Sequence, residues 1–158
     1  MSFMRFVGLS ISHLAFAGAG FAGGIYALPI LIAPDSPTVE AVDAVAANAQ
    51  FKGEFKRELA GSDALHWGEG SVAISSTAIS HMGELAPGPD YKLYLSPEFV
   101  ETEEEFEKLK SKMARVGDVK TFTNFVVDVP SSIDVSQYNT VVIWCEAFGE
   151  FITATTYQ

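Results

Sequence analysis

Apolar residues run without interruption through the first part of the chain and alternate with polar ones over most of the rest. Residues 6–33 form a stretch of 28 positions with no formal charge, longer than the roughly 20 apolar residues needed to cross a bilayer as a helix. This pattern predicts a transmembrane helix within residues 1–33 that acts as an uncleaved signal anchor. A cleaved signal peptide is the alternative, because residues 15–17 read Ala-Phe-Ala, as cleavage sites do.

The residues flanking this segment predict its orientation. Arg5 precedes it and Asp35 follows it, so the positive-inside rule places the N-terminus in the cytoplasm and the C-terminal domain in the periplasm or outside the cell. Gly20 and Gly24 form a GxxxG spacing, which can let two helices pack into a homodimer. Small residues are also common in membrane helices that do not pair.

Beyond the anchor, residues 34–49 contain prolines and an Ala/Val stretch, and we interpret them as a linker to a domain at residues 50–158. The domain shows the alternation of half-buried strands and runs of β-branched residues. These segments are residues 51–59, 70–74, 91–95, 125–129, 140–145 and 151–156. Short strands separated by Gly/Pro/Asp turns predict a mainly β domain, an antiparallel β-sandwich or a barrel-like fold.

One segment has helical spacing instead. Thr102 and Glu105 fit a capping box. Apolar residues then recur at positions 106, 109, 113 and 116, and Gly117 follows. The spacing predicts a single short amphipathic helix that ends at Gly117, with its charged side facing solvent.

Charge, like hydropathy, differs between the first 33 residues and the rest of the chain. The chain of 158 residues has a net charge of −10. Its first 33 residues contain one arginine and no acid, so the remaining 9 bases and 20 acids give the rest a net charge of −11. Such a surface disfavours binding to nucleic acid. The usual hydrolase, zinc-protease, nucleotide-binding and calcium-binding motifs are absent, so a stand-alone enzyme is not expected.

Cys145, the only cysteine, is the first candidate for chemistry. On a strand it shares a face with Val141 and Ile143, and a buried cysteine of this kind is inert. An unpaired cysteine in an exported domain is instead a candidate redox thiol or metal ligand. The adjacent carboxylate of Glu146 would raise the thiol pKa, which favours a metal or haem thiolate over a bare nucleophile.

His66, which precedes Trp67, is the second candidate. Its imidazole could bind a metal or haem, or its nitrogens could be satisfied by backbone groups. If His66 and Cys145 converge in space, a thiolate and an imidazole could together hold copper or haem iron. His81 and Met82 lie in what reads as a connecting segment and have a weaker case.

Four sequence features together resemble the DM-thirteen domain, or electron transfer DM, family. They are Gly53-x-Phe55, His66-x-x-x-Gly70-x-Val72, Gly88-Pro89-Asp90 and the apolar run ending in Trp144-Cys145. The resemblance implies a β-rich domain whose hallmark cysteine, here Cys145, acts in redox chemistry as a thiol or through a prosthetic group such as haem. The chain departs from the family's Gln-Tyr pair, with Asn124-Phe125 in its place.

Two functions are therefore expected. The first is a membrane-anchored extracytoplasmic domain in electron transfer or thiol redox chemistry, centred on Cys145, with His66 as a possible second ligand and an unidentified redox or protein partner. The alternative is a non-catalytic β-sandwich binding module in which Cys145 is structural. In that module Tyr91, Phe99 and Phe148 would be candidate contacts.

Overall fold

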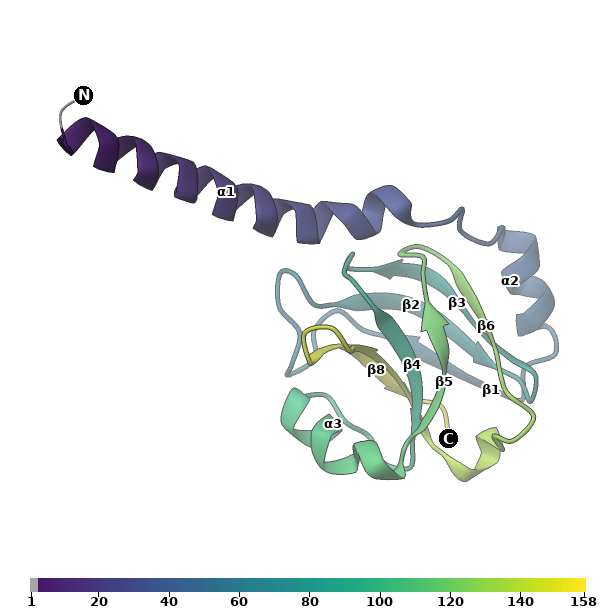
Figure 1. Cartoon of the computed structure of the whole chain (residues 1–158). Coiled ribbons are helices and arrows are strands. Elements are labelled where there is room, and N and C mark those ends of the chain that lie inside the picture. The colour runs from purple at the N-terminus through teal and green to yellow at the C-terminus, as the bar shows by residue number, and fades with distance from the viewer. Residues whose placement is uncertain (1–2) are drawn as a thin grey trace.

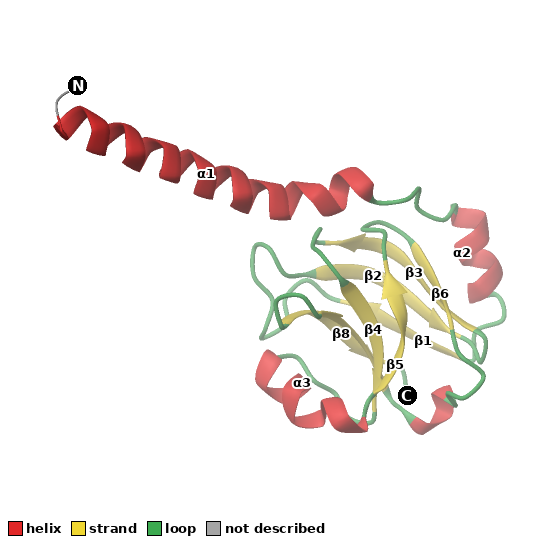
Figure 2. Cartoon of the chain, viewed as in Figure 1, coloured by secondary structure: helices red, strands yellow, loops and turns green. Residues whose placement is uncertain are grey.

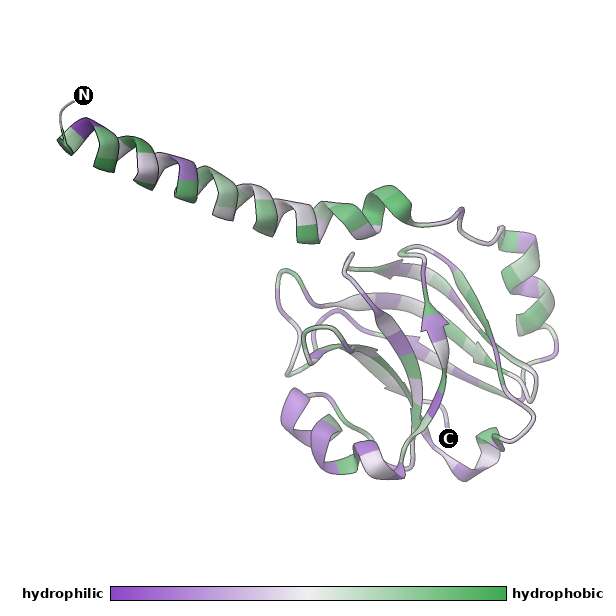
Figure 3. Cartoon of the chain, in the orientation of Figure 1, coloured by the Kyte–Doolittle hydropathy of each residue, from purple (hydrophilic) through white to green (hydrophobic). Residues whose placement is uncertain are grey.

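A long apolar helix precedes a β-rich domain (Figure 1). The computed structural model describes residues 3–158; Met1 and Ser2, at the start of the predicted anchor segment 1–33, lie outside the described residues. Helix α1 spans Phe3–Ile32 and is long and apolar enough to cross a membrane, a property that signal sequences share. Hydrophobic residues recur along its whole length (Figure 3).

Two antiparallel four-stranded sheets make up the domain (Figure 2). One sheet has the order β1-β2-β3-β6 and the other has the order β5-β4-β7-β8. The strands are β1 Phe51–Phe55, β2 Gly68–Ile74, β3 Ala78–Leu85, β4 Tyr91–Ser96, β5 Ala114–Val119, β6 Phe125–Asp128, β7 Thr140–Cys145 and β8 Glu150–Thr156. This arrangement confirms the predicted mainly β fold.

The two sheets also approach each other at both edges. Along one edge, the backbone N–H of Glu54 in β1 donates a hydrogen bond to Oγ1 of Thr155 in β8 at 3.2 Å. Along the other, Gly117 of β5 lies so close to Val127 of β6 that a Cβ at position 117 would stand 2.7 Å from its Cγ1. The sandwich is therefore nearly closed, like a flattened barrel.

The prediction of one helix that ends at Gly117 is wrong for the second half of that segment. Helix α3 covers Glu103–Leu109, a 3-10 turn follows at Lys110–Lys112, and Ala114 begins strand β5. The side chains of Val116 and Val119 enter the core, and β5 pairs with β4 along its length. Backbone pairing with a neighbouring strand thus overrides the helical spacing of the apolar residues.

The segment around His81 and Met82, predicted to be a connection, is strand β3 in the structure, so this prediction is wrong. Its middle residues, Ser80 and His81, are polar yet fully buried, so the alternation that signals a strand is interrupted there. Its neighbours β2 and β6 pair with it on both sides.

Strand β7 is buried on both faces, as its unbroken apolar sequence indicates. Val141, Ile143 and Cys145 belong to the core between the sheets, and this confirms their predicted common face. Trp144 points to the outer face, where its ring stacks on Phe106 of α3 with a centroid distance of 3.9 Å. The helix therefore covers the outer face of this sheet and presents its hydrophilic side to solvent (Figure 3).

A further helix, α2, spans Val39–Ala46 within the predicted linker. Thr38 caps its N-terminus through a hydrogen bond from the N–H of Ala41 at 3.3 Å. Val42 is buried, and its carbonyl accepts a hydrogen bond from Ser80 of β3 at 3.5 Å. The helix is packed against the β-domain, while the predicted boundary at residue 50 stays a prediction.

His81 is an unusual member of the core. Its Nδ1 lies 3.2 Å from the carbonyl oxygen of Thr123 and its Nε2 lies 3.1 Å from that of Glu69. Its ring stacks on Phe125 at 4.9 Å and lies 5.4 Å from Phe55. A neutral imidazole has only one N–H to donate, so one of the two carbonyls faces a lone pair.

We expect His81 to make the domain less stable in mild acid. Burial lowers the pKa of His81, outweighing the two carbonyls, so the unfolded chain takes up the proton first as pH falls through about 6.5. The free energy of unfolding should then decrease with falling pH, by at most about 1.4 kcal/mol per unit for one proton. Denaturant unfolding of wild type and His81→Gln between pH 7 and 5 should give a shallower slope for the variant; equal slopes would contradict this role.

Candidate functional site

The two candidate residues, His66 and Cys145, lie at the same end of the sandwich. The loops after β3 and β7 and the segment before β2 meet there, and the last turns of α1 lie over them (Figure 1). A cavity of about 120 Å³ lies at this end, and both His66 and Cys145 line it. The two residues therefore border the same cavity, while their joint role as ligands stays a prediction.

Cys145 ends strand β7 beneath this cavity. Its thiol donates a hydrogen bond to the carbonyl oxygen of Pro89, with an Sγ–O distance of 2.9 Å, and the residue is only 2% exposed. Burial raises the pKa of the Cys145 thiol, and the negative charges of Asp90 and Glu150 act in the same direction. The resting group is thus a protonated thiol.

Glu146, expected to raise this pKa, lies in a different environment. Its carboxylate accepts hydrogen bonds from the hydroxyl of Tyr94 and, at 3.0 Å, from the amine of Lys110 on the α3 side of the sheet. The carboxylates that act on Cys145 are instead those of Asp90 and Glu150.

His66 is oriented by one carboxylate. Its Nδ1 lies 3.1 Å from Oδ2 of Asp63. The other carboxylate oxygen accepts the backbone N–H groups of Leu65 at 2.6 Å and of His66 at 2.8 Å, and the first of these hydrogen bonds is the main reason why the pKa of Asp63 is lowered. The pairing to Nδ1 leaves Nε2 as the nitrogen available to a ligand, as in carboxylate–histidine–metal arrangements.

The donor set does not fit haem or a bound metal ion. Within residues 3–158, no three His, Cys, Asp or Glu side chains cluster in a way that could hold a metal. The cavity of about 120 Å³ is also too small for a haem macrocycle, since even drug-sized ligands occupy pockets of roughly 300–1,000 Å³. Cys145 and His66 therefore line the cavity as a thiol and an imidazole.

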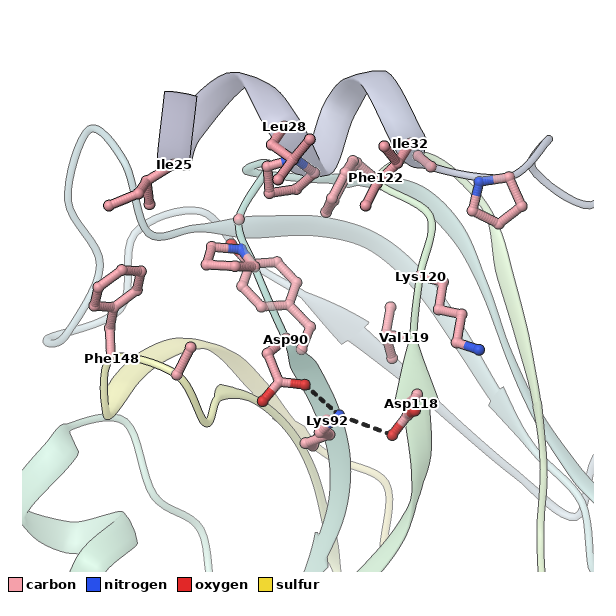
Figure 4. A pocket seen from close by; sticks show the side chains of 17 residues that line it. Ile25, Leu28, Ile32, Asp90, Lys92, Asp118, Val119, Lys120, Phe122 and Phe148 are labelled. Carbon is pink, nitrogen blue, oxygen red and sulfur yellow. Dashed lines mark hydrogen bonds and ion pairs between the residues drawn. The ribbon is translucent and has the colours of Figure 1, made fainter. Parts of the chain in front are cut away.

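A larger cavity of about 500 Å³ adjoins the first one (Figure 4). Ile25, Leu28 and Ile32 of α1 form one wall, and Phe122 and Phe148 of the domain lie opposite (Figure 4). The two cavities share residues 25, 88, 89, 91 and 148 in their walls. The sequence indicated none of this, although the anchor segment was longer than a span requires.

Three of the four charged residues that line the larger cavity are ion-paired, and Lys120 is the fourth. Lys92 pairs with Asp90 and with Asp118, the latter at 3.0 Å. Arg115 contacts Asp118 at 2.9 Å. These ion pairs lower the pKa of Asp118, chiefly through the hydrogen bond from Lys92.

The three aromatic residues predicted as contacts lie in different places. Phe148 is 56% exposed and lines both cavities. Tyr91 also lines both, but it is buried and its hydroxyl donates to the carbonyl of Ala86 at 2.8 Å. Phe99 is 42% exposed and belongs to neither cavity. Phe125, where the family pattern has tyrosine, contacts His81 in the core.

Comparisons with known proteins gave one match. Residues 38–157 match the model of the family described as "Electron transfer DM13". Neither the curated proteins nor the solved structures gave a match. The matched residues include α2, all eight strands and both His66 and Cys145.

Proposed function

Because this chain belongs to the Electron transfer DM13 family, we propose that it is a membrane-anchored electron-transfer component whose redox site is the cavity of His66 and Cys145. Family membership supports a redox role and a redox partner. The apolar helix α1 supports anchoring, and Arg5 ahead of it supports an extracytoplasmic position for the domain.

A single observation carries the assignment of the site. His66 lies in the loop before β2 of one sheet and Cys145 ends β7 of the other, far away in the sequence, yet both line one cavity. Helix α1 also covers part of the cavity, through Ala22, Ile25 and Tyr26. A site of this kind would exchange electrons only with a partner that docks beside it.

The chain's own groups set the starting state of the chemistry. The carbonyl of Pro89 holds the proton on Sγ of Cys145, and the carboxylate of Asp63 orients the imidazole of His66. Loss of that proton gives the thiolate, which a docked partner with a disulfide could oxidise by exchange: a mixed disulfide forms between Cys145 and one sulfur of the partner, and the other sulfur leaves as a thiolate. The residues present support a thiol as the redox group.

The alternative is a binding module in which Cys145 only fills space. The 2% exposure of Cys145 and its location in the core between the sheets favour this alternative. The two functions differ in whether the thiol reacts while the domain is folded.

We expect the thiol of the folded full chain, held in lipid nanodiscs, to react with a disulfide reagent slowly at pH 7 and faster as pH rises. The reaction should be at least about tenfold slower than that of free cysteine, because burial disfavours the thiolate and blocks the reagent. Tyr26→Ala, which removes part of the cover, should accelerate it several-fold. Phe16→Ala, on the same helix but outside both cavities, should have no effect.

Each remaining outcome contradicts the proposed thiol site. A thiol that reacts only after denaturation, in every variant, would favour the binding module. An absorption band of haem, or stoichiometric metal that disappears in Cys145→Ser, would show that the cysteine is a ligand.

A further inference from the structure

We propose that the two adjoining cavities bind one lipid-soluble quinone, with its ring in the cavity of His66 and Cys145 and its hydrocarbon tail in the larger apolar cavity. This inference names a redox partner for the site and rests on the proposed function. It concerns binding, and it follows from the length of α1, the lining of the cavities and their shared walls.

Helix α1 is longer than a membrane span. Its 30 residues extend for about 45 Å at about 1.5 Å per residue, whereas the hydrocarbon core of a bilayer is about 30 Å thick. About ten residues are left over. Those at the C-terminal end include Ile25, Leu28 and Ile32, the residues that line the larger cavity. With Phe3 near the opposite membrane face, the cavity lies where the helix leaves the bilayer, so a ligand can enter from the lipid.

The larger cavity suits a hydrocarbon chain. Ile25, Leu28, Ile32, Phe122 and Phe148 point into it (Figure 4). Of its four charged residues, those at positions 90, 92 and 118 pair with one another and Lys120 forms no ion pair with the described residues. The hydroxyl of Tyr91 is already bonded to a backbone carbonyl. A volume of about 500 Å³ is within the range of ligand pockets.

The smaller cavity suits an uncharged polar ring. Phe148 and Pro89 supply flat apolar surfaces, and His66 can accept a hydroxyl proton of a quinol at Nε2 while Nδ1 contacts Asp63. No lysine or arginine is among the residues that line it. A phospholipid headgroup would lack a partner for its phosphate there, and the net charge of −11 outside the first 33 residues would repel it.

The two cavities adjoin each other. Ile25, Pro89, Tyr91 and Phe148 line both, so a ligand that displaces a shared side chain such as that of Phe148 would occupy the two spaces together. A molecule with a compact polar head and a long apolar tail matches this pair of volumes, and a lipid-soluble quinone is the electron carrier of that shape.

The test uses the full chain in phosphatidylcholine nanodiscs and a benzoquinone that carries a ring azide and a ten-carbon tail. After illumination, mass spectrometry of peptides locates the label. We expect it near His66 and in the segment containing Phe148. The same ring without the tail should label at least tenfold less, because each methylene favours transfer of the probe out of water several-fold.

Matched variants separate this site from general lipid exposure. Phe148→Asp should reduce domain labelling at least tenfold, while Phe99→Asp, an equally drastic change at an exposed phenylalanine outside both cavities, should leave it unchanged. Circular dichroism confirms that both variants fold. Cys145→Ser should still be labelled, which distinguishes failure of quinone binding from failure of the proposed thiol chemistry.

Two results would overturn the proposal. Label confined to α1, with none in the β-domain, would show that the quinone stays in the bilayer. Equal competition by a ten-carbon alcohol would show that the cavities accept any lipid chain and have no place for a quinone ring.

Discussion

Gly70→Ala should destabilise the β-domain by about 3–5 kcal/mol, the sum of backbone strain and overpacking. Gly70 has φ +124°, and a Cβ there would lie 2.3 Å from the carbonyl oxygen of Met82 and 2.7 Å from Cα of Gly83, its partner on β3. Both contacts are with backbone, which a side-chain rotation cannot relieve. Denaturant unfolding of the full chain, followed by circular dichroism, measures the loss.

Gly149→Ala is the matched control for this substitution. Gly149 also has positive φ, at +70°, but the nearest atom to its added Cβ is Cζ2 of Trp144 at 3.9 Å, an ordinary contact. The variant should lose only the roughly 1–2 kcal/mol of a left-handed residue. Equal losses at the two positions would mean that the close crossing of β2 and β3 is not what restricts position 70.

Phe106→Ala should cost a similar amount, about 3–5 kcal/mol, through a different mechanism. The ring is fully buried, stacks on Trp144 at 3.9 Å and meets Tyr94 edge-on at 5.2 Å. Its removal leaves a cavity between α3 and β7 that the helix cannot close without moving. Unfolding free energy gives the magnitude, and the near-ultraviolet circular dichroism of Trp144 should weaken at the same time.

Phe99→Ala provides the comparison, since Phe99 is 42% exposed and surface changes of this kind usually stay within about 0.5 kcal/mol. If Phe106→Ala were as mild as Phe99→Ala, α3 would be a loosely attached cover rather than part of the packed domain.

Local patterns in the sequence were enough to predict the strands with clear alternation. In β7, Val141, Ile143 and Cys145 face the core because successive side chains of a strand point to opposite sides, and the structure confirms this. The pattern failed where a tertiary partner decided the outcome. Val116 fits a helix and a strand equally well by spacing, and only its pairing with β4 selects the strand. Strand β3 was not predicted, because the buried polar residue His81 interrupts the alternation of hydropathy that indicates a strand.

The candidate site was only half predictable. Chemistry alone singled out His66 and Cys145, but their meeting in one cavity depends on how the two sheets stack, which no local pattern encodes. Phe122 and Ile25 were missed for the same reason: each is an ordinary apolar residue until α1 lies over the loops of the domain. Their only signal was the surplus length of the anchor segment.

The near-closure of the sandwich affects how the domain behaves at high protein concentration. Proteins tethered to a bilayer meet one another at high local concentration, and an open sheet edge would then recruit strands from neighbouring copies. Over the described residues, β1 lies against β8 and β5 lies against β6, so each terminal strand is shielded by its own chain. The domain is thereby protected against edge-to-edge aggregation, also at the high local concentration that the proposed membrane anchor would create.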